Sequence, residues 1–154
     1  LSKSELNIQL GLEGDLKKMA SFITQLYKTY IEYTEDKYPQ IAFDSSKKFI
    51  PLVITLEAWY INLNPRIWKM LREKVIENFN KRKISVSLID NFPYHIRSSE
   101  DFEKDIQLIN SLGILGYFDK VTKNELHDYI QNFNYCNPFE GEFEKIFIEP
   151  LETI

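Results

Sequence analysis

Glu57 is the carboxylate whose position most favours chemistry. It stands at the carboxyl end of segment 49–56, an apolar and β-branched run typical of a buried strand, and Tyr60 follows in an aromatic loop. Ligands of α/β proteins bind at the carboxyl ends of parallel strands, and apolar walls raise the pKa of a carboxyl group held against them. Glu57 and Tyr60 are therefore candidate ligand-site residues. The alternative is a loop carboxylate that pairs with Arg66 or Lys69.

His95 is the third candidate for the same site, because it follows the alternating segment 84–88, which predicts another strand. His127 has no cysteine or carboxylate at metal-binding spacing, so a surface or packing role is expected. Cys136 has no base beside it and is expected to act as a small hydrophobe. A single cysteine fits a reducing compartment, and we expect the protein in the cytoplasm.

Positive charge is concentrated in residues 65–83. Seven cations stand there against two carboxylates, a local net charge of +5 in a chain whose net charge is −4. Cations can follow a phosphate backbone, and aromatic side chains can stack on bases. The candidate nucleic-acid contacts are Arg66, Lys69, Arg72, Lys81, Arg82, Lys83 and Trp59. A solvated helix face has the same composition and is the alternative.

The last third of the chain is acidic. Residues 98–133 and residues 134–154 each carry a net charge of −4. In the final stretch glutamates alternate with Phe139, Phe143 and Phe147. This pattern predicts either a surface that docks a basic protein partner or the chain's own basic helix, or an ordinary amphipathic helix that packs on the core.

Periodicity predicts a β-α-β-α-β order followed by helices. Two crossover units of this size imply a parallel sheet, so the expected fold is α/β, with a small three-stranded sheet flanked by helices and a helical C-terminal third. The pair Gly11 and Gly14 lacks the spacing of a dinucleotide-binding loop and predicts a tight turn. The expected strands are 6–12, 49–56 and 84–88, and the expected helices are 16–36, 65–83, 98–112 and 122–133, with a short helix from Glu140.

The length of 154 residues and a composition with 44% hydrophobic and 27% charged residues favour one globular domain. Its sheet part is expected at residues 4–90 and its helical part at 98–153. The first residue is Leu rather than Met, so we expect a piece of a larger protein. No apolar run approaches the roughly 20 residues needed to span a bilayer, so no membrane is expected as a partner.

The element order over residues 4–90 resembles the second half of the PD-(D/E)XK, or restriction-endonuclease-like, nuclease fold. The first helix carries Lys17, Lys18 and Gln25 and leads to a buried strand. The exonuclease branch of that family has a Gln and a Tyr one turn apart on this helix. Here Gln25 has Thr29 at that spacing, and Tyr30 comes one residue later.

The resemblance implies a Mg²⁺ site built from an Asp and a strand-borne Glu-x-Lys. This chain departs from that pattern, because its first expected strand offers only Glu5 followed by Asn7. The letters Glu35-Asp36-Lys37 match, but they fall at the end of a predicted helix. If the resemblance holds, the metal ligands lie upstream, so we expect no cofactor and no catalytic residue in the chain as given.

Three functions follow from these patterns. The leading hypothesis is a non-catalytic portion of a larger nuclease-like protein that contacts DNA or RNA through its basic helix. The alternative is a protein-interaction module that uses its acidic C-terminal helices to bind another protein or the rest of its own chain. The third is a small-molecule enzyme that uses Glu57 and His95, which requires those two side chains to lie within reach of each other.

Overall fold

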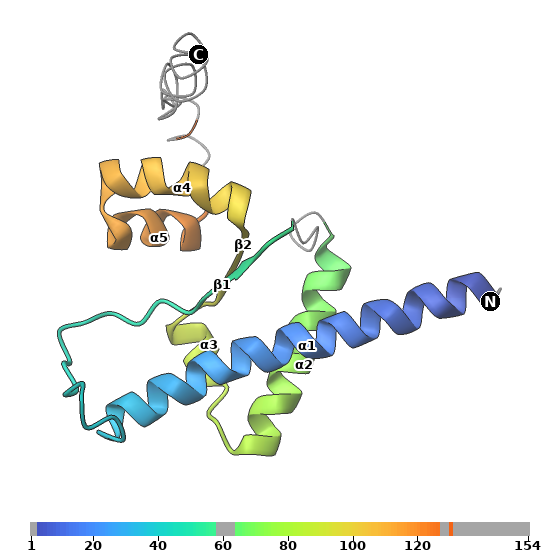
Figure 1. The fold of residues 1–154 in the computed structure, drawn as a ribbon, viewed down its shortest axis with the longest axis horizontal. Helices are drawn as coiled ribbons and strands as arrows, with labels where there is room; N and C mark the ends of the chain where they lie inside the picture. Colours follow the sequence, from blue (N-terminus) through green and yellow to red (C-terminus); the bar gives the residue numbers. More distant parts are fainter. Residues whose placement is uncertain (1–2, 58–63, 127–129, 131–154) are drawn as a thin grey trace, which may run out of the picture. The chain divides into compact units, whose positions relative to one another are not determined.

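The computed structural model describes residues 3–57, 64–126 and 130, with side chains from residue 11 onward. It divides into two compact units, Leu1–Glu103 and Lys104–Ile154. The elements, coloured along the chain in Figure 1, are α1 (Lys3–Thr34), β1 (Leu52–Thr55), α2 (Pro65–Arg82), α3 (Ser87–Asn91), β2 (His95–Ser98), α4 (Ser99–Leu112) and α5 (Ile114–Thr122). The α/β class and the parallel pairing are confirmed.

Helix α1 replaces the first predicted strand. Segment 6–12 alternates in hydrophobicity, yet its backbone is helical and continuous with the rest of α1. The apolar stripe of α1 extends back to Leu12, which packs against the core one turn before the buried Leu16. Helix formation is cooperative once nucleated, so a long packed helix propagates through a short stretch whose pattern favours a strand. The turn predicted at Gly11 and Gly14 is wrong for the same reason.

Both glycines are expected to weaken α1. A Cβ atom added at Gly11 or Gly14 would meet nothing within 4 Å, and neither residue has a positive φ. Replacing both by alanine should raise the free energy of unfolding by about 0.5–1 kcal/mol for each site, because glycine costs that much inside a helix. Urea denaturation measures the change. A loss of stability in the double variant would contradict the helical assignment of this stretch.

The sheet of the described residues has two parallel strands rather than three, with Leu52 opposite His95 and Thr55 opposite Ser98. The predicted strand 84–88 is wrong. The amide of Ile84 donates to the carbonyl of Phe79 at 2.9 Å, and the next amides close the turn that begins α3. These local hydrogen bonds occupy the backbone groups that a third strand would need. Strand β2 forms instead at residues 95–98, which the sequence pattern did not indicate.

The apolar sequence of segment 49–56 predicts a strand that is buried on both faces. Strand β1 is not, so that prediction is wrong. Ile54 is 49% exposed and Leu56, just beyond the strand, is 90% exposed. Val53 and the buried Ile96, which are paired in the register, contribute to the core instead. Only one face of the small sheet is therefore covered within the first unit.

Helix α2 forms as its sequence predicts. The Asn64 side chain accepts hydrogen bonds from the backbone amides of Arg66 and Ile67, and Pro65 occupies the first turn, where its missing N–H costs nothing. Leu71, Val75 and Phe79 form the buried stripe. Lys83 ends the helix in the left-handed conformation, with φ of 57°.

The core of the first unit lies where α1 crosses α2 (Figure 1). The Tyr27 ring meets the ring of Phe79 edge-on, with centroids 5.0 Å apart, and Phe49 meets Tyr27 in the same way at 5.6 Å. Phe49 also stacks on Tyr30, with centroids 4.3 Å apart and planes 9° from parallel. This aromatic cluster attaches the loop before β1 to α1.

Two buried tyrosines of this core differ in their hydrogen bonding. The Tyr27 hydroxyl donates to the carbonyl of Phe92, whereas the buried Tyr94 hydroxyl has no partner among the described residues. Burial raises the pKa of Tyr27 well above its usual range and raises the pKa of Tyr94 to about 12, so both hydroxyls are neutral at physiological pH. The pair therefore offers a matched test of what one buried hydroxyl contributes.

Replacing each tyrosine by phenylalanine should give changes of opposite sign. Tyr27→Phe leaves the Phe92 carbonyl without its donor and is expected to lower the free energy of unfolding by about 1–2 kcal/mol. Tyr94→Phe removes an unpaired buried hydroxyl and is expected to raise it by about 1 kcal/mol. Parallel urea titrations of the two variants measure both values. Equal decreases in the free energy of unfolding for the two variants would mean that the Tyr94 hydroxyl also has a hydrogen-bond partner.

In the second unit, α5 follows α4 after Gly113, whose φ of 73° suits glycine. Helix α4 begins at Ser99 in the first unit and ends at Leu112, close to its predicted bounds. Thr122 was expected to start a helix, but it ends α5, and its hydroxyl donates to the carbonyl of Phe118 at 2.8 Å. Of the predicted helix 122–133, residues 123–125 are not helical and Leu126 and Ile130 are, while residues 127–129 and 131–133 and the segment from Glu140 lie outside the described residues. No described helix combines the length and the apolarity that a bilayer crossing requires.

Candidate polyanion-binding groove

The predicted basic residues of α2 do not form one surface. Arg72 forms an ion pair with Asp90 of α3 at 2.9 Å and lines a hollow with Trp68 and Tyr94. Arg66, Lys69 and Lys83 are exposed, and no described carboxylate pairs with them. Trp59 and Tyr60 lie outside the described residues, as do the acidic segment 134–154, His127 and Cys136.

An open groove of about 260 Å³ lies between α1 and α2. Four of its lining side chains are cationic and one is acidic. Its lining residues are Lys17 and Ser21 from α1, and Lys74, Glu77, Asn78, Lys81 and Arg82 from α2. We call this the α1/α2 groove.

Helical spacing explains how the groove arises. Lys17 and Ser21 stand one turn apart on the flank of the buried stripe of α1. Lys74, Asn78 and Lys81 recur every three or four residues on the corresponding flank of α2. When the two apolar stripes pack, these flanks come together beside the core. The α1 flank supplies Lys17, and the α2 flank supplies Lys74, Lys81 and Arg82.

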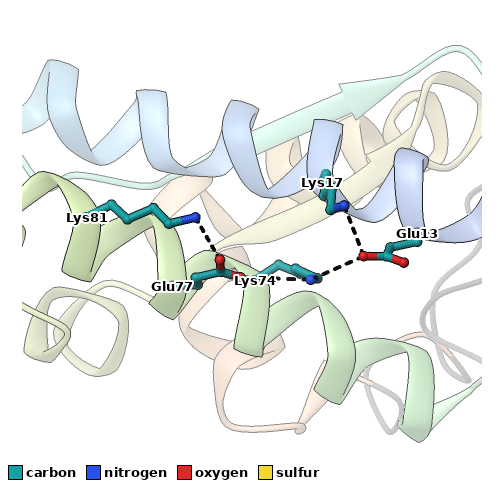
Figure 2. Close-up of polar contacts among 5 residues, drawn as sticks. All are labelled: Glu13, Lys17, Lys74, Glu77 and Lys81. Atoms are coloured by element: carbon teal, nitrogen blue, oxygen red, sulfur yellow. Dashed lines mark hydrogen bonds and ion pairs between the residues drawn. The ribbon is translucent and has the colours of Figure 1, made fainter.

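Ion pairs link the lysines of the groove in a row, as Figure 2 shows. Glu13 lies 3.0 Å from Lys17 and 3.6 Å from Lys74, so it joins the two helices. Glu77 lies 3.8 Å from Lys74 and 2.7 Å from Lys81. Three ammonium groups are thus held near one another by two carboxylates. We call these five residues the lysine row.

The charge states of the row follow from its geometry. The hydrogen bond from Lys17 lowers the pKa of Glu13, and that from Lys81 lowers the pKa of Glu77. Both carboxylates are therefore ionised at neutral pH. With Arg82, the row has four positive and two negative charges, so a net charge of +2 remains beside α1 and α2. These pairs are solvent-exposed, so they contribute little to stability.

Binding rather than bond-breaking is the chemistry that these groups can perform. Lysine ammonium groups bind phosphate as point charges, and the Ser21 hydroxyl and the Asn78 amide can add neutral hydrogen bonds. In the part of the chain that the structure describes, no three His, Cys, Asp or Glu side chains gather as metal ligands. The described residues therefore do not fit the Mg²⁺ site that the nuclease resemblance implies.

The structure does not bring Glu57 and His95 together. His95 pairs with Leu52 at the start of β1, whereas Glu57 comes two residues after the end of that strand. The strand alone separates them by about 10 Å. Burial, aided by the charge of Arg97, lowers the pKa of His95 to about 4, so its imidazole is neutral at pH 7. Glu57 is exposed.

Of the groove residues, the candidates from the sequence included Lys81 and Arg82 but not Lys17, Ser21, Lys74, Glu77 and Asn78. Lys74 was counted in the basic segment, and Lys17 was noted only within the nuclease resemblance. In the sequence, each lysine lies on the flank of an apolar stripe, at one-turn spacing from another polar residue, and this pattern could have indicated a groove residue. The pattern does not predict which two helix flanks pack side by side.

In comparisons with known proteins, no family model matches the chain, and neither a curated protein nor a solved structure matches it.

Proposed function

We propose that this chain binds the phosphate backbone of nucleic acid in the α1/α2 groove, as a non-catalytic portion of a larger nuclease-like protein. The observation that carries the proposal is the convergence of Lys17, Lys74, Lys81 and Arg82 from two helices around one open groove. It refines the basic-helix hypothesis, because Lys17 of α1 joins the contact set and Arg72, which pairs with Asp90, leaves it.

The lysine row suits a polyanion better than a single small anion. Its ammonium groups follow one another along the helices, as phosphates do along a strand (Figure 2). Glu13 and Glu77 hold the lysine side chains in place before binding, and a phosphate oxygen can then replace a carboxylate oxygen as the acceptor. Because the pairs are exposed, this exchange has a small energetic cost.

The salt dependence of oligonucleotide binding tests the proposal, because phosphate contacts release counterions. Fluorescence anisotropy with a labelled oligonucleotide of about 20 nucleotides, at salt concentrations between roughly 50 and 200 mM, gives the slope of log K against log[salt]. Four phosphate contacts should give a slope of about −3 for single strands and about −3.6 for duplex. Undetectable binding at the lowest salt concentration, or a slope near zero, would refute the proposal.

A further inference from the structure

A second hollow lies on the other flank of α2. Its volume is about 250 Å³, and it is formed where α2, α3 and the turn before β2 meet, all within the first unit. Its lining residues are Trp68, Arg72, Ile89, Asp90, Pro93 and Tyr94. We call it the Trp68 hollow. None of these residues lines the α1/α2 groove.

Its charged pair has unused hydrogen-bonding capacity. Arg72 donates one hydrogen bond, from Nη2 to Oδ1 of Asp90, at 2.9 Å. Among the described residues, no other group bonds to Oδ2 of Asp90 or to the other guanidinium N–H groups. The side chains of Arg72 and Asp90 are 43% and 66% exposed. The hollow therefore presents a strong donor directly beside a strong acceptor.

The rest of the lining is apolar and partly flat. The rings of Trp68 and Tyr94 lie with centroids 5.3 Å apart and planes tilted by 35°. Pro93 and the buried Ile89 complete the apolar lining. An indole next to a donor–acceptor pair is a combination that binds planar polar rings, because the ring stacks while its edge forms hydrogen bonds.

We propose that the Trp68 hollow binds an unpaired guanine base. Guanine presents N7 and O6 as acceptors and N1–H and N2–H as donors along adjacent positions of its edge. Arg72 can donate to O6 and N7, and Asp90 can accept from N1–H and N2–H. Adenine places a donor where guanine has O6 and an acceptor at N1, so it opposes both residues. The pairing selects guanine over adenine.

The base can come from a free nucleoside or from a single strand, and this inference does not depend on phosphate binding in the α1/α2 groove. NMR with ¹⁵N-labelled protein follows the Trp68 indole N–H and the Arg72 Nε–H signals while guanosine, inosine or adenosine is added. Guanosine is expected to bind at least about 10-fold more tightly than adenosine. Inosine, which lacks the N2 amino group, should fall between them.

Asp90→Asn is the decisive variant, because an amide cannot accept from both N1–H and N2–H. Guanosine affinity should fall about 10-fold, while Asp119→Asn, an exposed carboxylate on α5, should leave it unchanged. Equal affinity for guanosine and adenosine, or no signal change with either, would overturn the inference. In the oligonucleotide anisotropy assay, the protein should bind a guanine-containing strand more tightly than a thymine strand only while Asp90 is intact. This comparison separates binding of the base from binding of the phosphate backbone. If the thymine strand also fails to bind, the proposed function fails while the guanosine result stands.

Discussion

Replacing Lys17, Lys74, Lys81 and Arg82 by glutamine should weaken oligonucleotide binding by about 100- to 1,000-fold at roughly 0.1 M salt. The same change should flatten the salt slope by about three units, because four phosphate contacts no longer release counterions. All four side chains lie on the open groove rather than in the core, so the fold should persist. Anisotropy titrations of both proteins measure the slopes, and circular dichroism checks the fold.

The control removes the same charge elsewhere. Lys37, Lys47, Lys48 and Lys123 are exposed and lie outside the groove, so their replacement by glutamine should change affinity by less than about threefold. Glu77→Gln, in contrast to the groove variant, should strengthen oligonucleotide binding, because it removes the carboxylate that competes for Lys74 and Lys81. If the control weakens binding as much as the groove variant, net charge alone governs binding and the groove has no special role.

The second large effect concerns the crossing of α1 and α2. Phe79 is fully buried and its ring meets that of Tyr27 edge-on. Phe79→Ala should lower the free energy of unfolding by about 3–5 kcal/mol, since it removes apolar contacts and leaves a cavity. A loss of this size can exceed half the stability of a small domain. Chemical denaturation measures it.

Phe22 provides the matched control, because it is a phenylalanine on α1 that is 57% exposed. Phe22→Ala should change the free energy of unfolding by less than about 0.5 kcal/mol. Similar losses for the two variants would show that the helix crossing does not form the core described above. The unfolded fraction of Phe79→Ala should not bind the oligonucleotide, since the groove exists only while the helices pack.

The elements predicted correctly are those set by neighbouring residues. Asn64 and Pro65 begin α2 through local hydrogen bonding and a fixed φ, and Leu71, Val75 and Phe79 form its buried stripe. Ser99 begins α4 close to the predicted residue. In these cases the capping group and the 3.6-residue period lie within one segment of the chain, so local interactions determine where the helix forms.

The predictions that failed concern short segments with two available backbone states. Segment 6–12 alternates over seven residues, but it is continuous with a helix that is stabilised elsewhere by packing. Segment 84–88 has strand-forming side chains, but the amide of Ile84 is hydrogen-bonded to Phe79 at the end of α2. An alternating segment of five or seven residues cannot outweigh such competition, because its backbone groups form hydrogen bonds with the adjoining helix instead of with another strand.

The sequence by itself determined the charge of the α2 segment, the limits of that helix, and the parallel α/β character of the fold. Only the tertiary structure decided which cations work together. Arg72 and Lys74 are two residues apart, yet one lines the hollow beside α3 and the other lines the groove beside α1. Successive helical residues point about 100° apart, so the element packed on each side of α2 assigns each cation its partner.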